Sequence, residues 1–179
     1  RSTALARGRQ GFSSGVSTIR AFLKGYSVVM SEAQKLSQKI HSRTAKIVVI
    51  GMGYVGLPLA HAFARKGFPV TGIDIDARRV EAINRGRSYI GDLSSKDLRI
   101  VVKRGLLKAS ADYGVLQEMD VVIICVPTPL NRFKDPDISY IAAVTEAISK
   151  YLHRGLLVIL ESTTYPGTTE EVILPSLEK

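Results

Sequence analysis

Short runs of apolar residues alternate along the chain with segments in which apolar residues recur every three or four positions. The apolar runs cover residues 47–50, 69–74, 121–126 and 156–160, and a weaker one covers residues 106–110. Runs of this length are typical of parallel strands buried on both faces, and the helical spacing between them is typical of crossover helices. The pattern predicts an α/β fold with a Rossmann-type, doubly wound parallel sheet.

Helical spacing and capping residues locate the segments between the strands. Helices are expected over residues 31–40, 76–85 and 94–104, and two more are expected after residues 137 and 168. The last of these would run to Lys179, and the one before it would bury Ile141, Val144, Ile148 and Leu152. The side chains expected to cap these helices are Ser31 with Gln34, Ser94 with Asp97, Asp137, and Thr168 with Glu171.

A glycine-rich turn follows the first predicted strand. Gly51, Gly53 and Gly56 have the spacing G-x-G-x-x-G, and apolar residues at helical spacing come directly after them. Gly51 permits a tight turn, Gly53 lets a pyrophosphate approach the backbone, and Gly56 lets the helix lie close to the strand. The positive end of that helix would face the phosphates. A glycine-rich turn of another α/β protein is the simpler alternative, but the flanking strand and helix favour dinucleotide binding.

An acidic residue closes the second predicted strand, where a ribose would be recognised. Asp74 lies 18 residues beyond Gly56, near the expected spacing. Its carboxylate would repel a 2′-phosphate by roughly 4 kcal/mol per charge pair at about 4 Å and an effective dielectric constant of about 20. Arg78 and Arg79 argue the other way, because they could bind that phosphate. We expect NAD rather than NADP.

Composition and charge exclude several classes of protein. Of the 179 residues, 45% are apolar and 23% are charged, which is ordinary for a globular protein. No apolar run reaches the ~18 residues that a transmembrane helix needs. The net charge is +9, but no ladder of aromatic and basic residues for stacking bases is present. We therefore expect neither a membrane span nor a nucleic-acid partner.

The first 29 residues differ from the rest. They contain five of the 25 basic residues and no acidic residue, and they are rich in Ser and Gly. An organellar transit peptide has such a composition, but we favour a disordered or foreign tail, with the folded domain covering residues 30–179.

Cysteine and histidine argue against disulfides and metals. The single cysteine, Cys125, excludes an intramolecular disulfide and fits a reducing, cytoplasmic environment. His41, His61 and His153 show no metal-like spacing. We expect them to be solvated or at helix ends, and we expect no metal site.

Two hydroxyl-rich turns follow predicted strands. Thr128 lies between two prolines after residue 126, and Glu161 is the first residue after strand 156–160. Ligands of doubly wound sheets bind beyond the carboxyl ends of the strands, so both turns should meet the glycine-rich turn. Glu161 is a candidate for proton transfer, because partial burial would favour its protonated form. Alternatively, Thr128 and Glu161 only satisfy backbone groups in turns.

Together these motifs resemble the UDP-glucose/GDP-mannose dehydrogenase family. The resemblance covers residues 31–179 and rests on Val-Ile-Gly-Met-Gly-Tyr-Val-Gly-Leu-Pro, Gly-Ile-Asp-Ile-Asp, Cys-Val-Pro-Thr-Pro-Leu and Glu-Ser-Thr-Thr-Tyr-Pro-Gly-Thr-Thr-Glu-Glu. The last two are most similar to the branch that oxidises UDP-N-acetylglucosamine, or its galacto epimer, at C6. The resemblance implies two oxidation steps from alcohol to carboxylate with two NAD. It also implies a homo-oligomeric full-length enzyme of polysaccharide biosynthesis.

The resemblance implies roles for residues of the coenzyme site. Tyr54 and Val55 would line the pyrophosphate turn, and Asp74 would hold the adenosine ribose. Arg79 matches an arginine near the adenosine, and Thr128 matches a threonine near the nicotinamide and the reactive water.

It also implies a substrate site. Glu161 matches an acid that assists hydrolysis of a covalent thioester, and residues 131–137 would border the nucleotide-sugar pocket. The other residues expected beside the substrate are Ser162, Thr163, Thr164 and Tyr165.

The family's nucleophilic cysteine, its central helix and its UDP-binding domain would lie beyond residue 179. Cys125 is expected to be an inert thiol within a core strand. We therefore expect an incomplete Rossmann domain without turnover of its own. The alternatives are a non-catalytic NAD-binding module, an enzyme for UDP-glucose or UDP-N-acetylmannosamine, and a dehydrogenase of 3-hydroxyacids or 6-phosphogluconate.

Overall fold

The structure is a computed structural model that describes residues 30–129 and 136–178. Within it, Glu32–Lys179 form one compact unit. The expectation for residues 1–29 lies outside the described residues, as does that for residues 131–135 of the predicted nucleotide-sugar border.

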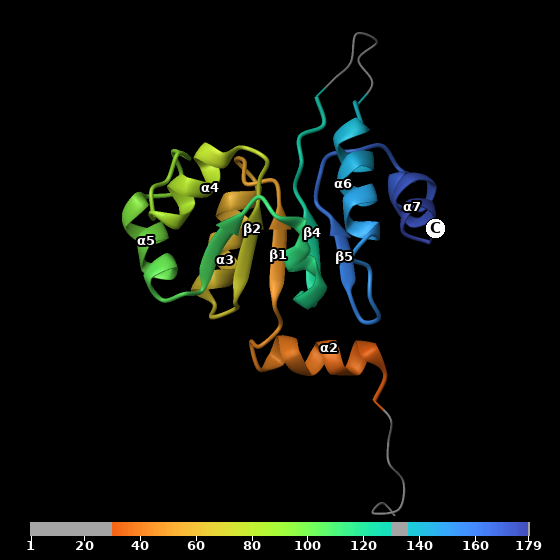
Figure 1. Cartoon of the computed structure of the whole chain (residues 1–179), viewed down its shortest axis with the longest axis horizontal. Helices are drawn as coiled ribbons and strands as arrows, with labels where there is room; N and C mark the ends of the chain where they lie inside the picture. The colour runs from red at the N-terminus through yellow and green to blue at the C-terminus, as the bar shows by residue number, and fades with distance from the viewer. Residues whose placement is uncertain (1–29, 130–135, 179) are drawn as a thin grey trace, which may run out of the picture. The chain divides into compact units, whose positions relative to one another are not determined.

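Five parallel strands form one sheet in the order β3-β2-β1-β4-β5 (Figure 1). Strand order reverses beside β1, since the chain builds β2 and β3 on one side of it and β4 and β5 on the other. This arrangement confirms the predicted doubly wound, Rossmann-type sheet and creates a switch point between β1 and β4. The strands are β1 (Ile47–Ile50), β2 (Val70–Ile73), β3 (Leu107–Ser110), β4 (Val121–Ile124) and β5 (Leu157–Leu160).

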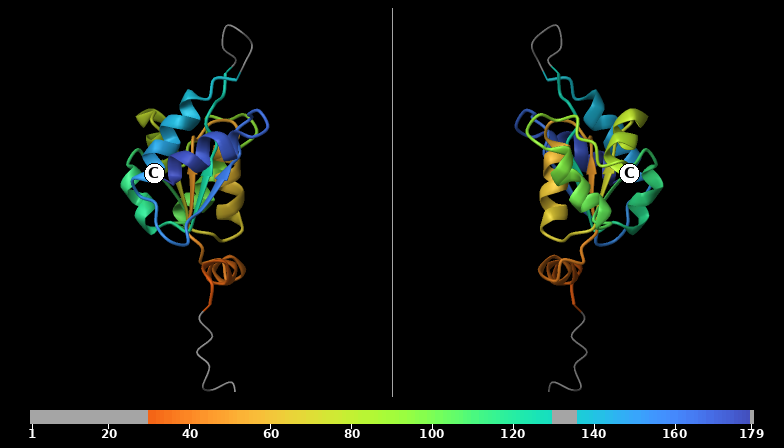
Figure 2. Two further views of the ribbon diagram at one scale, coloured as in Figure 1. Left: turned by 90° about the vertical axis from the view of Figure 1, so that its right-hand side faces the viewer. Right: turned by 90° about the vertical axis from the view of Figure 1, so that its left-hand side faces the viewer.

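Helices cover both faces of the sheet, as the side views in Figure 2 show. The segments α3, α4 and α5 pack on one face, and η1 and α6 pack on the other. The helical elements are α2 (Glu32–His41), α3 (Gly56–Arg65), α4 (Ala77–Asn84), α5 (Ser95–Lys103), the 3-10 helix η1 (Tyr113–Glu118), α6 (Ser139–Ser149), the π-helical turn η2 (Thr169–Ile173) and α7 (Leu174–Leu177). No helix among these described residues is long and apolar enough to cross a bilayer.

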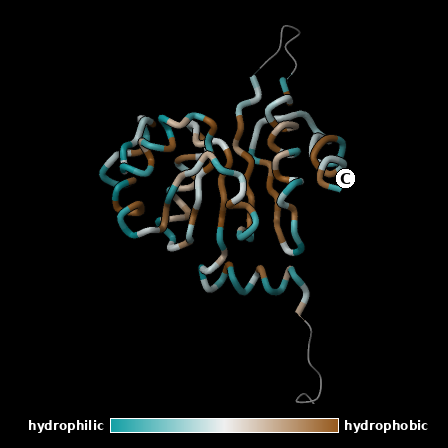
Figure 3. The backbone as a smooth tube through the Cα atoms, in the orientation of Figure 1, coloured by the Kyte–Doolittle hydropathy of each residue, from teal (hydrophilic) through white to brown (hydrophobic). Residues whose placement is uncertain are grey.

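Alternate side chains of the central strands enter two different cores. On β1, Ile47 and Val49 join the core under α3, whereas Val48 and Ile50 join the core under α6. All four residues of β1 and all four of β4 are buried. The apolar strands in the middle of Figure 3 show why these segments read as continuous hydrophobic runs.

Two of the predicted helix caps are wrong. The Asp137 carboxylate accepts the N–H of Ser139, but Ile138 occupies the cap position and has no side-chain cap. The Thr168 hydroxyl donates to the Tyr165 carbonyl at 2.8 Å and does not cap the π-helical turn that follows. In both cases a short polar side chain bonds within its own turn, which competes with capping. The cap predicted at Ser94 is present, with its hydroxyl accepting the N–H of Asp97.

The last strand differs from the expected core strand. Leu157 is 40% exposed and Ile159 is 36% exposed, because β5 lies at the edge of the sheet in the described residues. Helix α6 also ends at Ser149, so Leu152 lies outside it and is exposed. The amino-acid composition of a strand such as β5 does not show whether another strand or a helix covers it.

One histidine contradicts its expectation. His61 lies in the middle of α3 and is only 7% exposed, so it is neither solvated nor at a helix end. Its Nε2 is the one buried side-chain nitrogen or oxygen without a hydrogen-bond partner among the described residues. Burial lowers the pKa of this imidazole. By contrast, His41 ends α2, as expected.

Candidate functional site

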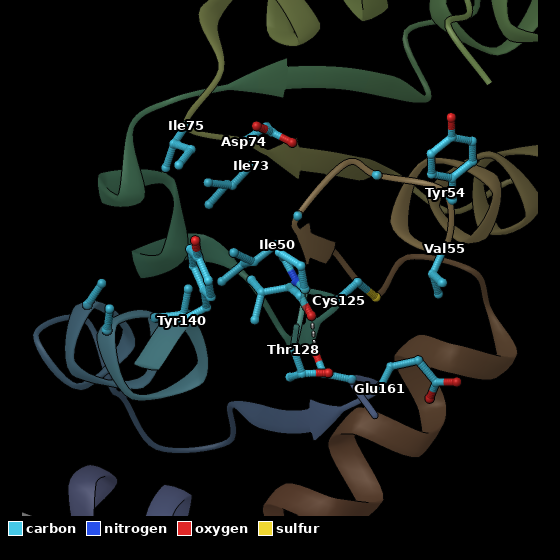
Figure 4. A pocket seen from close by; sticks show the side chains of 18 of the residues that line it. Ile50, Tyr54, Val55, Ile73, Asp74, Ile75, Cys125, Thr128, Tyr140 and Glu161 are labelled. Atoms are coloured by element: carbon cyan, nitrogen blue, oxygen red, sulfur yellow. Dashed lines mark hydrogen bonds between the residues drawn. The ribbon is translucent and has the colours of Figure 1, made fainter. Parts of the chain in front are cut away.

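A cavity of about 690 Å³ opens at the carboxyl ends of the strands (Figure 4). In that view Asp74 lies on one side, Thr128 and Glu161 lie on the other, and Ile50 and Cys125 lie between them. The cavity occupies the switch point of the sheet, where the topology predicts a ligand. The predicted site residues that line it are Gly51, Gly53, Tyr54, Val55, Asp74, Arg79, Thr128, Glu161, Ser162 and Thr163.

The three glycines of the turn have different surroundings. Gly51 has a φ of +91°, and a Cβ there would lie 2.5 Å from the Cys125 carbonyl oxygen. A Cβ on Gly56 would collide with the Gly51 carbonyl oxygen, whereas a Cβ on Gly53 would have no atom within 4 Å. Gly51 and Gly56 therefore have steric roles inside the protein, and Gly53 leaves open space beside the cavity.

The N-terminus of α3 is not capped by a side chain. Val55 occupies the cap position without a side-chain hydrogen bond, and Gly53, Tyr54 and Val55 all line the cavity. Tyr54 is 80% exposed, so its side chain does not close the turn. The uncapped N–H groups and the helix dipole suit an anion at this position.

Asp74 is buried and fixed by three hydrogen bonds. Its Oδ2 accepts the N–H of Met52 at 2.9 Å and Nη1 of Arg79 at 3.3 Å, and its Oδ1 accepts the N–H of Asp76 at 2.8 Å. A carboxylate offers about four acceptor positions, so the Asp74 carboxylate retains capacity for about one further donor such as a ribose hydroxyl.

An aromatic residue that the sequence did not indicate joins this cluster. The Tyr89 hydroxyl donates to the Met52 carbonyl at 2.6 Å, and the Arg79 guanidinium lies 5.8 Å from the centre of the Tyr89 ring. Burial, and then the charge of Asp74, raise the pKa of Tyr89 to about 12. This phenol is therefore a hydrogen-bond donor at any physiological pH.

The turns after β4 and β5 are joined to each other. The N–H of Glu161 donates to the Ile124 carbonyl, and the Ser162 hydroxyl donates to the Val126 carbonyl at 2.8 Å. These bonds bring the Glu161 turn beside the Thr128 turn. The expected partial burial of Glu161 is wrong, because its side chain is exposed in this structure. Thr164 and Tyr165 do not line the cavity.

Cys125 lies directly after β4, under the glycine-rich turn, and it is buried. Burial, and then the charge of Glu161, raise the pKa of its thiol to about 11. The thiol therefore stays protonated at neutral pH and is a poor nucleophile. Among the described residues, no group of three His, Cys, Asp or Glu side chains could hold a metal ion.

Helix α6 supplies a wall that the sequence analysis missed. The stripe at positions 140, 143, 144 and 147 of α6 faces the cavity, and residues at and after the end of β2 and in η1 complete this part of the lining. The spacing i, i+3, i+4, i+7 is a signal for one face of a helix, but it overlaps the neighbouring stripe of α6 that packs into the core. The lining residues missed here are Ile73, Ile75, Tyr113, Tyr140, Ala143 and Ala147.

Comparison with known proteins finds relatives among nucleotide-sugar dehydrogenases. The chain is 39% identical over 134 residues to UDP-N-acetyl-D-glucosamine 6-dehydrogenase of Pseudomonas aeruginosa, covering 75% of this chain and 31% of that protein. It is 41% identical over 128 residues to UDP-N-acetyl-D-mannosamine dehydrogenase of Pyrococcus horikoshii, covering 71% and 30%. The solved structure of NDP-N-acetyl-D-galactosaminuronic acid dehydrogenase from Methanosarcina mazei Go1 superposes with a TM-score of 0.72 at 35% identity, covering 83% and 34%.

The chain thus spans about a third of the length of the curated relatives it matches. The profile described as "UDP-glucose/GDP-mannose dehydrogenase family, NAD binding domain" matches residues 45–179. The open glycine-rich turn, the uncapped helix and the fixed carboxylate are consistent with that match. The chain belongs to the UDP-glucose/GDP-mannose dehydrogenase family, and NAD is its coenzyme.

Proposed function

We propose that this chain is the coenzyme-binding part of a longer enzyme that oxidises C6 of a UDP-N-acetylhexosamine to the uronic acid with two NAD. One observation carries the proposal: the β4 and β5 turns bring Thr128 and Glu161 to the cavity that also contains the glycine-rich turn. The relative named for UDP-N-acetyl-D-glucosamine supports a UDP-N-acetylhexosamine of the gluco or galacto type. UDP-glucose and UDP-N-acetylmannosamine are the alternative substrates, and one similar relative is named for the latter.

The residues present fit NAD, and we assign them by their chemistry. The backbone of Gly53, Tyr54 and Val55 would bind the diphosphate, because it is open to the cavity and lies at a helix N-terminus. The Asp74 carboxylate would accept a ribose hydroxyl, and Arg79 would border the adenosine. When bound, NAD supplies the hydride acceptor.

Thr128 and Glu161 are the proposed reaction-side residues. The Glu161 carboxylate is ionisable and borders the cavity, so it can take a proton from an attacking water. The Thr128 hydroxyl can orient that water or the sugar. Ser162, Thr163, Thr164 and Tyr165 are proposed to border the sugar, although the last two lie outside the cavity described here.

Because the match covers only about a third of each relative's length, we propose that other parts of the whole protein complete the Rossmann domain begun in residues 30–179 and supply the nucleophile and the uridine diphosphate site. We further propose a cytoplasmic homo-oligomer that serves polysaccharide biosynthesis.

The test uses the longer protein, with UDP-N-acetylglucosamine, UDP-N-acetylgalactosamine, UDP-N-acetylmannosamine and UDP-glucose compared by NADH formation. We expect UDP-N-acetylglucosamine or UDP-N-acetylgalactosamine to give the highest kcat/KM, and Glu161→Gln to lower kcat by about a hundredfold or more. Glu146→Gln is the matched control, since Glu146 is an exposed carboxylate of α6 that does not line the cavity. If the longer protein bound NAD but oxidised none of the four UDP-sugars, the result would contradict the proposed activity and favour a non-catalytic NAD-binding module.

A further inference from the structure

Met52, the residue between the first two glycines of the turn, is held at three points. Its N–H donates to Asp74 Oδ2 at 2.9 Å, and its carbonyl accepts the Tyr89 hydroxyl at 2.6 Å. Its side chain is fully buried against Gly72 of β2, where a Cβ would lie 2.5 Å from the Met52 Cε. Both backbone polar groups of Met52 are therefore bound by side chains from outside the turn.

The bond from Tyr89 sets the direction of the next peptide group. No peptide bond among the described residues is cis, so the Met52 carbonyl and the Gly53 N–H point in opposite directions across one planar unit. The carbonyl is directed at Tyr89, which does not line the cavity. The Gly53 N–H is thus directed away from Tyr89, and Gly53 is one of the residues that line the cavity.

On the Gly53 side of that peptide there is room for a different backbone angle. Gly53 has no atom within 4 Å of a Cβ position, and glycine tolerates most backbone angles. A rotated peptide would present the Met52 carbonyl oxygen to the cavity, where it would repel a phosphate. The Tyr89 hydroxyl opposes this rotation, because its bond would be lost and the phenol would be left without its acceptor.

Tyr89 is also linked to the ribose side of the site. Arg79 lies over its ring and bonds to Asp74, and Asp74 bonds to the same Met52 that Tyr89 holds. The raised pKa of Tyr89 keeps the hydroxyl a donor across the working pH range. The side chains of Asp74, Arg79 and Tyr89 therefore form one cluster around the backbone of Met52.

We propose that Tyr89 is a positioning residue for the coenzyme diphosphate, which acts by holding the Met52 carbonyl away from the cavity and so presenting the Gly53 N–H to a phosphate oxygen. The inference rests on NAD binding by this family, and Tyr89 touches neither the coenzyme nor the substrate in it. It assigns a role to a residue of the 86–92 loop, which lies outside the glycine motif.

The test compares ligands with and without a diphosphate. NAD and ADP-ribose are titrated into the chain by calorimetry, and adenosine is titrated by NMR, for the unmodified chain, Tyr89→Phe and the matched control Tyr151→Phe. Tyr89→Phe keeps the ring beside Arg79 but removes the hydroxyl. We expect it to weaken NAD and ADP-ribose by about tenfold, the worth of one hydrogen bond, and to leave adenosine binding unchanged.

A merely structural role would weaken adenosine and the diphosphate ligands alike, and that result would overturn the proposal, as would no change for any ligand. The Gly53 amide resonance gives a second readout, which should move in Tyr89→Phe and not in Tyr151→Phe. If the unmodified chain bound no NAD, the proposal that residues 30–179 bind the coenzyme would fail instead, so the two failures are distinguishable.

Discussion

The side-chain amide of Asn84 pairs with both backbone groups of Ala109. Its Nδ2 donates to the Ala109 carbonyl at 3.0 Å, and its Oδ1 accepts the Ala109 N–H at 2.8 Å. Ala109 belongs to β3, the strand at one edge of the sheet. Asn84, at the end of α4, thus takes the place of a neighbouring strand at this residue and blocks the edge against further pairing.

Removing this pair should destabilise the domain. Asn84→Ala leaves two buried backbone groups of Ala109 without partners, so we expect the free energy of unfolding to fall by about 1–3 kcal/mol. Urea unfolding measures the change. Arg85→Ala is the control, because it removes only an exposed ion pair with Glu81, worth at most about 1 kcal/mol. Equal losses in the two variants would contradict the role of Asn84.

Substitution of Gly56 should lower the stability of the fold, whereas substitution of Gly53 should weaken NAD binding. Gly56→Ala forces a Cβ into the Gly51 carbonyl, so we expect a loss of about 2–4 kcal/mol of unfolding free energy. Gly53→Ala meets open space, so the fold should change by less than about 1 kcal/mol while NAD binding weakens, because the methyl group occupies the phosphate side of the turn. Thermal unfolding and calorimetry read the two effects. A Gly53→Ala variant with full NAD affinity would disprove that placement.

Asp74 should control the choice between NAD and NADP. Asp74→Asn keeps the shape of the side chain and removes its charge, so the repulsion of a 2′-phosphate disappears. We expect the preference for NAD over NADP to fall by about tenfold or more, measured by calorimetric titration with both coenzymes. Asp76→Asn is the control, since Asp76 caps α4 and binds Arg78 outside the cavity. The hypothesis fails if both variants shift the preference equally.

His61 should make the domain less stable in acid. Burial lowers the pKa of the folded imidazole below its ordinary value of 6.5, so the unfolded chain binds the proton first as the pH falls. This group's share of the unfolding free energy is therefore complete above about pH 6.5 and is lost as the pH drops through the lowered pKa. Urea unfolding between pH 8 and pH 5 measures the unfolding free energy of the unmodified protein and of His61→Leu. As the pH falls, the unmodified protein should lose more of this free energy than the variant does. His41→Leu, at the end of α2, should show no such shift.

The central strands and the glycine-rich turn were readable from the sequence because their signals are local. The buried run of β1, the glycine spacing and Asp74 lie within 28 consecutive residues, and each reports its own backbone or burial requirement. Tyr89 gave no signal, since its acceptor on Met52 is 37 residues away and its loop has no periodicity. Thr168 misled because a hydroxyl near a helix start can bond either a helix N–H or a nearby carbonyl, and here it bonds the carbonyl.

The hydrogen bond from the Ser162 hydroxyl to the Val126 carbonyl connects the turn after β4 with the turn after β5, so the two turns should move together. In the proposed function, a sugar that displaces the turn carrying Glu161 must therefore also pull on the segment that leads to Thr128. Binding of the sugar and positioning of the coenzyme would then be coupled through the Ser162 hydroxyl, without any motion of the sheet.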